Sequence, residues 1–385
     1  MQRPVFTATR PFSQLQHPRE VIRQFTPNWF AVVMGTGVLA LALSLMSPTW
    51  PAVQALARGL WLLGMAQFVL FSALYLARWV LFFDEARRIF GHSTVSMFIG
   101  TIPMGLATLL NGYWLFGLPQ WGDGAVPLVE ALWWLDVGMA LLCGVGIPFL
   151  MFTRQAHSID QMTAVWLLPV VAAEVAAASG GLLAPHLADP AAQLRVLVTS
   201  YVLWAFSVPV AFAILTILLL RMALHKLPHE NMAASSWLAL GPIGTGALGM
   251  LVLGAHAPQV FAANAVLPVV GQVAQGLGVI AAISLWGFGL WWMLLAVLIT
   301  LRYLRSGIPF NLGWWGFIFP LGVYTLATVR LGEVLHMSFF TVVGQVLVVV
   351  LALMWLMVFG KTVRGAWRGE LFVSPCISVA KCQRS

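Results

Sequence analysis

Charged side chains are scarce in this chain. Asp, Glu, Lys and Arg together make up 8% of its 385 residues, while 61% of the residues are hydrophobic. A water-soluble protein carries about 25% charged residues, most of them on its surface. This shortage excludes a soluble globular protein and favours a chain that is largely embedded in a lipid bilayer.

Cysteine and the motifs of common enzymes are also scarce or missing. The three cysteines, Cys143, Cys376 and Cys382, are too few for a disulfide framework. The sequence has no glycine-rich phosphate loop, no His-Glu-x-x-His zinc motif and no Gly-x-Ser-x-Gly nucleophile motif. His225 and His229 have a metal-ligand spacing, but a proline lies between them and prevents one regular helical face from presenting both rings. We therefore expect no enzyme activity, no cofactor and no metal site.

Ten long apolar stretches dominate the sequence. A helix that spans a bilayer needs about 20 mainly apolar residues. The stretches cover residues 28–47, 55–83, 94–116, 127–152, 161–183, 194–222, 234–255, 270–301, 312–334 and 338–360. They predict an all-α transmembrane domain at 27–361, with short segments at 1–26 and 362–385. Residues 1–26 contain no apolar core, so we expect no cleaved signal peptide.

The basic residues predict the orientation of these stretches. If both termini are cytoplasmic, 17 of the 20 Lys and Arg residues fall on the cytoplasmic side. Basic residues are retained on that side during membrane insertion. We therefore predict cytoplasmic termini and a place in the bacterial inner membrane. No basic run is dense enough to predict nucleic-acid binding.

The odd-numbered stretches share a weak point about two turns from their cytoplasmic ends. It consists of Gly35 and Gly37 in the first stretch, and of Pro103, Pro169, Pro242 and Pro320 in the others. Proline inside a helix costs about 3 kcal/mol, and a lipid-facing backbone has no water to compensate for the lost hydrogen bond. The repeat predicts five helical hairpins, with kinked odd helices around a central pore and longer even helices facing lipid. Alternatively, these residues serve close helix packing.

Four motifs resemble one transporter family. They are PNWFAVVMGTG at 27–37, WLLPVV at 166–171, GPIG at 241–244 and WWGFIFP at 314–320. They are similar to motifs of the tellurite-resistance/dicarboxylate transporter family, and the resemblance covers roughly residues 24–362. That family includes tellurite-resistance protein A, the fungal malate permease and sulfite efflux pump, and the plant guard-cell slow anion channel.

The resemblance implies ten helices in five hairpins, a central pore, a homotrimer, and a phenylalanine on the ninth helix that blocks the pore. The position that matches this gate is Phe319, directly before Pro320. An apolar ring in a narrow pore resists wetting and so obstructs ions.

Few polar residues lie on the odd stretches. Thr36, Thr101 and Thr245 lie beside the weak points, where their hydroxyls either donate hydrogen bonds to a passing anion or bond back to the preceding turn. Glu174 and Arg330 are charged residues at membrane depth, where ionisable groups are costly and often functional. They are predicted to pair, or Glu174 is protonated and couples protons to transport. Asp136, on the fourth stretch, is expected to stay hydrated or paired locally.

Two functions therefore compete. The favoured one is a channel for small anions such as chloride, nitrate or carboxylates. The alternative is a proton-coupled transporter of C4-dicarboxylates such as malate, or an efflux system for oxyanions such as sulfite or tellurite. The channel requires no titratable group in its path, whereas the proton-coupled transporter would use Glu174.

Overall fold

The computed structural model describes residues 11–46, 49–264, 268–375 and 377. Cys376 and Cys382 lie outside these residues. Every regular element in the described part of the chain is helical, and ten helical spans are long and apolar enough to cross a membrane. The predicted fold class and number of spans are confirmed.

The spans alternate between buried and lipid-accessible. The most apolar parts of the first, third, fifth, seventh and ninth spans are 78–94% buried, against 22–33% for the other five. The inner helices are α2 (Phe30–Met46), α5 (Thr101–Gly112), α8 (Leu168–Leu183), α11 (Leu240–Ala263) and α13 (Ile318–Leu335). The outer helices are α3 (Pro51–Leu81), α7 (Val126–Thr153), α9 (Pro190–His225), α12 (Pro268–Leu304) and α14 (Ser338–Arg368).

Shorter elements complete the spans and the connections. The short α-helices are α1 (Glu20–Arg23), α4 (Phe83–Ala86), α6 (Leu118–Trp121) and α10 (Ser235–Leu238). The 3₁₀ turns that precede inner helices are η1 (Pro27–Trp29), η3 (Val95–Gly100), η7 (Ala164–Leu167), η9 (Glu230–Met232) and η10 (Leu312–Phe317). The remaining ones are η2 (Arg87–Gly91), η5 (Asp123–Ala125), η6 (Ile159–Gln161) and η8 (Ala184–His186), with a π-helical turn, η4, at Tyr113–Gly117. The tenth span continues to Arg368, so the predicted tail boundary at 361 falls inside α14.

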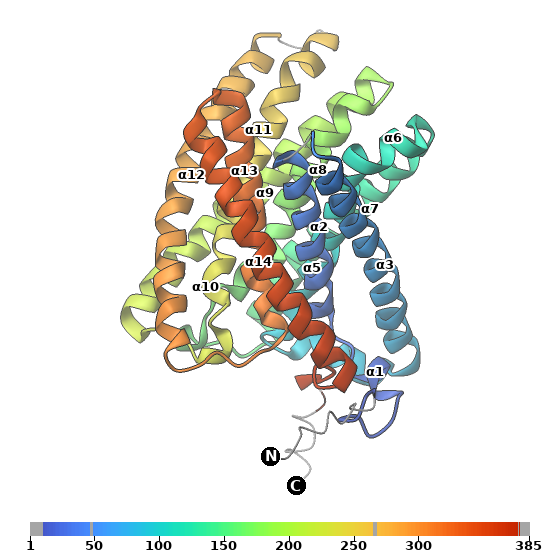
Figure 1. Ribbon diagram of the computed structural model, residues 1–385, viewed down its shortest axis with the longest axis vertical. Coiled ribbons are helices and arrows are strands. Elements are labelled where there is room, and N and C mark those ends of the chain that lie inside the picture. The colour runs from blue at the N-terminus through green and yellow to red at the C-terminus, as the bar shows by residue number, and fades with distance from the viewer. Residues whose placement is uncertain (1–10, 47–48, 265–267, 376, 378–385) are drawn as a thin grey trace, which may run out of the picture.

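The contacts between the five inner helices close a ring, and Figure 1 shows the bundle from its side. α2 contacts α5, α5 contacts α8, α8 contacts α11, α11 contacts α13, and α13 returns to α2. Each outer helix contacts the two inner helices beside it: for example, α9 contacts both α8 and α11, and α14 contacts both α13 and α2. Each inner helix therefore meets two inner neighbours, which explains why the odd-numbered spans are the buried ones.

A glycine lies at each of the five interfaces within the ring. A methyl group added to any of these glycines would come within 2.3–2.9 Å of an atom of the next helix or its preceding turn. The contacts pair Gly37 with Thr108, Gly100 with Leu168, Gly181 with Val252, Gly244 with Tyr324 and Gly322 with Val38. A real methyl group does not fit at such distances, so the ring can be this narrow only because these side chains are absent.

The four prolines occur at the start of α-helices rather than inside them. Pro169 is the second residue of α8, and Pro103, Pro242 and Pro320 are each the third residue of their helix. The first four N–H groups of an α-helix have no intrahelical partner, so proline costs little there. The prolines thus mark a change of helix type: at the prolines of α5, α8 and α13 a 3₁₀ turn gives way to α-helix, and in α11 the short helix α10 precedes the proline. A kink at these places stays a prediction.

The glycine pair in α2 differs from the prolines. Gly35 and Gly37 are the sixth and eighth residues of α2, so they lie inside the α-helix rather than in its first turn. A methyl group on Gly35 would lie 2.6 Å from the Trp315 ring, and one on Gly37 would lie 2.3 Å from the Thr108 hydroxyl. Both glycines serve close packing, which was the alternative interpretation of the repeat.

Two glycines one turn apart in α11 test this account of the ring. In Gly244→Ala the new methyl group would lie 2.7 Å from the backbone nitrogen of Tyr324, whereas in Gly241→Ala it would meet nothing within 4 Å. We expect Gly244→Ala to lose about 1–3 kcal/mol through overpacking. Gly241→Ala should be neutral or slightly stabilising. Heating followed by fluorescence-detected gel filtration measures both, and equal stability of the two variants would contradict the packing role.

Candidate functional site

A cavity of about 560 Å³ opens at the end of the ring where all five inner spans begin. Pairs of residues three positions apart contribute to its wall from each span. They are Ala31 and Met34, Phe98 and Thr101, Val165 and Leu168, Ser235 and Leu238, and Gly313 and Gly316. The cavity is therefore centred on the ring, and its wall is built from the first turns of the inner spans.

Phe319 follows the cavity-lining part of the ninth span, as the second residue of α13. A 3₁₀ helix has three residues per turn, so positions three apart face the same direction. Gly313 and Gly316 of η10 both line the cavity, and Phe319 is the next position in that series. The Phe319 side chain is 3% exposed and does not line the cavity itself. By this spacing it comes about one turn after Gly316 along the chain, at the start of α13.

The residue before the proline differs among the inner helices. Ile102, Leu168, Gly241 and Phe319 occupy this place in α5, α8, α11 and α13. Gly241 is buried, yet an added methyl group there would meet nothing within 4 Å. Because Gly244 packs against Tyr324, Gly241 and Phe319 lie at similar depth on neighbouring helices. The open space beside Gly241 and the Phe319 side chain therefore lie at about the same depth in the ring of helices.

Phe317 is held differently from Phe319. Its ring packs edge-on against Trp237, with centroids 5.9 Å apart, and against Trp314 at 5.8 Å. Among the described residues, Phe319 has no comparable ring contact. Phe317 thus belongs to an aromatic cluster of the wall, and Phe319 does not.

The cavity contains little formal charge. Glu370 is the one charged residue that lines it within the described part of the chain, and it lies 3.5 Å from Arg368. The positive ends of five helix dipoles converge here instead, since every inner span starts at this end. A positive potential made by backbone N–H groups attracts an anion without a side chain that binds it tightly.

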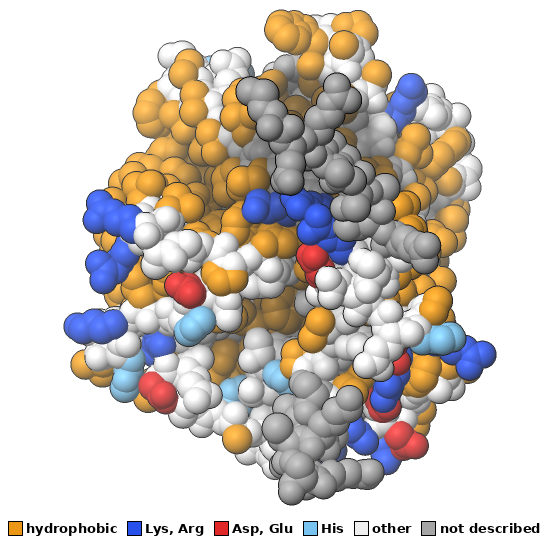
Figure 2. Space-filling model, turned by 60° about the horizontal axis from the view of Figure 1, so that its bottom comes forward, with side chains coloured by type: hydrophobic (Ala, Val, Ile, Leu, Met, Phe, Trp, Pro, Cys, Tyr) orange, Lys and Arg blue, Asp and Glu red, His pale blue; other side chains and the backbone are white. Residues whose placement is uncertain are grey.

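The face around the cavity carries basic side chains toward its edge (Figure 2). Some of them are neutralised locally. Arg23 donates two hydrogen bonds of 2.7 Å to the Glu85 carboxylate, which lowers the pKa of that carboxyl below its ordinary value. Lys361 instead lies over aromatic rings, with its Nζ 5.2 Å from the centre of Trp314.

The segment after α14 folds across one side of the cavity. Leu371, Val373 and Pro375 contribute to the lining. Phe372 stacks on Trp29 with ring centroids 5.1 Å apart, and the Ser374 hydroxyl accepts a 3.1 Å hydrogen bond from Arg78. Sequence reasoning missed this segment because nothing near 370–375 indicates which distant residues it meets.

The three predicted threonines have different environments. Thr101 lines the cavity, and its hydroxyl lies 2.8 Å from the carbonyl oxygen of Pro27 and 2.7 Å from that of Phe98. Thr36 accepts a 3.2 Å hydrogen bond from the Trp355 indole of α14. Thr245 is buried, and its hydroxyl has no hydrogen-bond partner among the described residues. Thr101 alone is thus brought to the cavity.

The predicted pairing of Glu174 with Arg330 is wrong. Arg330 pairs with Glu333, at 2.7 Å, on a partly exposed surface. The Glu174 side chain is fully buried in α8, and neither carboxylate oxygen has a hydrogen-bond partner in the described structure. Counting residues along two helices gave similar depths for the two groups but no information about their directions.

Glu174 also points away from the line of cavity-facing residues. It lies six positions after Leu168, which corresponds to about 120° around an α-helix. Two turns further on, the same face of α8 carries Gly181, which packs against Val252 of α11. Ser207 of the outer helix α9 acts on the Glu174 carboxyl, so this carboxyl lies near the contact of α8 with α9.

Asp136 also differs from expectation. It is fully buried on α7, and both of its oxygens lack a hydrogen-bond partner among the residues described. The expectation that it stays hydrated or locally paired was wrong, because its place on the helix turns it inward although α7 as a whole is mostly exposed.

Comparison with known proteins decides the family. Residues 24–363 match the SLAC1 family, described as voltage-dependent anion channels. The chain belongs to the SLAC1 family. This confirms the resemblance found in the four sequence motifs, since the two assignments cover almost the same residues.

Relatives across the SLAC1 family are named as transporters. The sulfite efflux pump SSU1 of Arthroderma benhamiae is 37% identical, over 91% of this chain and 93% of its own. An uncharacterized transporter of Methanocaldococcus jannaschii is 29% identical, over 92% and 96%. The malic acid transport protein of Schizosaccharomyces pombe is 23% identical, over 89% and 78%. Membership of this family makes the chain an integral membrane transporter of anions.

Proposed function

We propose that this chain provides a gated path for small anions through the middle of its inner ring, with the Phe319 ring as the obstruction. The observation that supports the proposal is that Gly313 and Gly316 line the cavity and that Phe319, a large apolar residue, is the next position at the same spacing. The open space beside Gly241, at similar depth, would give the Phe319 side chain room to move.

The electrostatics of the cavity favour conduction over tight binding. Five helix N-termini attract an anion, and the wall offers hydroxyl and backbone groups in place of basic side chains. A conducting site must bind an ion well enough to admit it and weakly enough to release it. A wall with little formal charge meets both requirements.

Sulfite-like oxyanions are the proposed substrates. The support is the 37% identity to proteins named sulfite efflux pumps over nearly the whole of both chains. A malate-like dicarboxylate is the second candidate, supported by the weaker similarity to a malic acid transport protein. Uptake of radiolabelled sulfite, chloride and malate into liposomes containing the purified protein compares them directly.

The proton-coupled alternative depends on Glu174. Its buried carboxyl without a partner is what such a mechanism would require, but its direction, about 120° from the cavity line, separates it from the proposed path. We therefore favour passive conduction, in which the anion moves down its own electrochemical gradient.

Orientation, location and assembly stay predictions. The first and last described segments lie together, since the backbone nitrogen of Phe12 donates a 2.7 Å hydrogen bond to the carbonyl oxygen of Trp367. We propose that this shared side is cytoplasmic, as the basic residues predict, and that the protein is a homotrimer. A bacterial inner membrane also stays a prediction, since the relatives named above come from fungi and an archaeon.

Removal of the proposed gate should increase transport. We expect Phe319→Ala to raise anion flux by about tenfold or more, the equivalent of lowering the barrier by about 1.4 kcal/mol, because the path becomes easier to wet. Flux into liposomes at matched protein content measures the effect. The control is Phe149→Ala, which removes a ring that is 62% exposed on α7 and should leave flux unchanged. Unchanged flux in a folded Phe319→Ala protein would contradict the gate.

Neutralisation of Glu174 separates the two mechanisms. In a passive path, Glu174→Gln should leave sulfite flux and its response to a pH gradient like those of the unmodified protein. The measurement is uptake into liposomes with and without an inward proton gradient. Loss of gradient-driven uptake in Glu174→Gln, with folding intact, would favour the proton-coupled transporter instead.

A further inference from the structure

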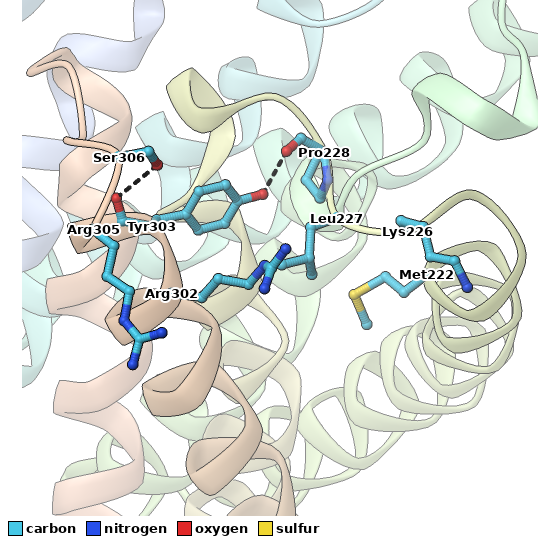
Figure 3. Close-up of a pocket in the computed structure, with 8 residues that line it drawn as sticks. All are labelled: Met222, Lys226, Leu227, Pro228, Arg302, Tyr303, Arg305 and Ser306. Carbon is cyan, nitrogen blue, oxygen red and sulfur yellow. Dashed lines mark hydrogen bonds between the residues drawn. The ribbon is translucent and has the colours of Figure 1, made fainter.

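A second cavity, of about 710 Å³, lies away from the ring at the ends of two outer helices (Figure 3). Met222 of α9 and the loop at 226–228 form one side. The last turn of α12 and the residues after it form the other, where Arg302, Arg305 and Ser306 belong to the lining. We refer to it as the α9–α12 pocket.

Three basic residues line this pocket, and two of them lack a protein partner among the described residues. Lys226 donates a 3.2 Å hydrogen bond to the carbonyl oxygen of Ala223, so it caps the end of α9. The side chains of Arg302 and Arg305 make no hydrogen bond or ion pair with any residue that the structure describes. A role in compensating the helix dipole accounts for the presence of basic residues at a helix end, but not for their arrangement around a cavity.

The wall of the pocket is fixed from both sides. The buried Arg221 guanidinium donates to the carbonyl oxygens of Asp160 and Lys226, the latter at 2.6 Å. The Tyr303 hydroxyl donates a 2.5 Å hydrogen bond to the carbonyl oxygen of Pro228. These bonds hold the loop against α12, so the pocket is built into the fold. The acidic residue nearby, Glu230, acts electrostatically on Tyr303 but forms no ion pair with either arginine.

The surroundings of the pocket are apolar and face lipid. On α9, Leu220 and Leu224 are 56% and 65% exposed, and on α12, Leu298 and Leu301 are 63% and 54% exposed. Both helices end at the pocket, so if α9 and α12 span the bilayer, the pocket lies near its headgroup region. Basic pockets in this position between membrane helices recognise anionic headgroups.

We propose that the α9–α12 pocket binds the headgroup of an anionic phospholipid. Arg302, Arg305 and Lys226 surround the phosphate, and the acyl chains lie along the exposed leucines of α9 and α12. The site is separate from the ring and does not depend on the proposed anion path. The shared chemistry, a phosphate group, also occurs in soluble phosphates, so the experiment must separate the two sources.

The test uses native mass spectrometry of the full-length protein after delipidation in detergent. Phosphatidylglycerol should bind at least about fivefold more tightly than phosphatidylcholine. Arg302→Gln and Arg305→Gln should each weaken phosphatidylglycerol binding about fivefold, the equivalent of about 1 kcal/mol for one basic residue at an anionic surface. Arg302→Lys keeps the positive charge and should retain most of the binding. This result would show that the loss in Arg302→Gln is not caused by misfolding.

Arg154→Gln is the matched control. Arg154 is an exposed arginine that follows the end of outer helix α7 and does not line the pocket, so its substitution should leave lipid binding unchanged. Equal affinity for the two lipids, or an equal loss in Arg154→Gln, would overturn the proposal in favour of diffuse surface charge. Displacement of the lipid by glycerol phosphate at similar concentration would overturn it in favour of a soluble phosphate ligand.

Discussion

Close packing of the five inner helices against one another is the constraint on which the rest of this structure depends. Each interface of the ring has a glycine at a place where a methyl group would overlap the neighbouring inner helix. In a membrane, lipid tails are as apolar as the side chains, so helices associate through tight packing rather than through the hydrophobic effect. The small residues thus set the diameter of the ring, and with it the width of any path through it.

The same constraint explains how an anion transporter manages with few charges. Because the inner spans all begin at one end, their dipoles add there, and each 3₁₀ turn and helix start contributes N–H groups to the cavity wall. The prolines fit this arrangement since they occupy positions whose N–H groups would have no helical partner. In the proposed path, backbone dipoles would take the place of basic side chains, which would hold an anion more strongly and for longer.

Much of the architecture was predictable from the sequence. Length and hydropathy identified ten spans, and the repeated prolines identified the buried ones, because both signals depend on local composition. The angular positions of side chains were not predictable. Glu174 and Arg330 have similar predicted depths, yet they face different neighbours. Asp136 turns inward although most of α7 is exposed. The packing of Phe372 on Trp29 joins residues that are more than 340 positions apart, and no local pattern encodes such a contact.

The contact of α14 with α2 has a consequence for biosynthesis. The ring is closed where the last hairpin meets the first, through contacts such as that of Trp355 with Thr36. Nine spans can therefore enter the membrane while the groove between α13 and α2 is still uncovered by α14. During translation this seam is exposed to lipid until the final residues emerge from the ribosome. A nascent chain that stops early would be left as an open arc of helices, which the quality-control proteases of the membrane could recognise along that single edge.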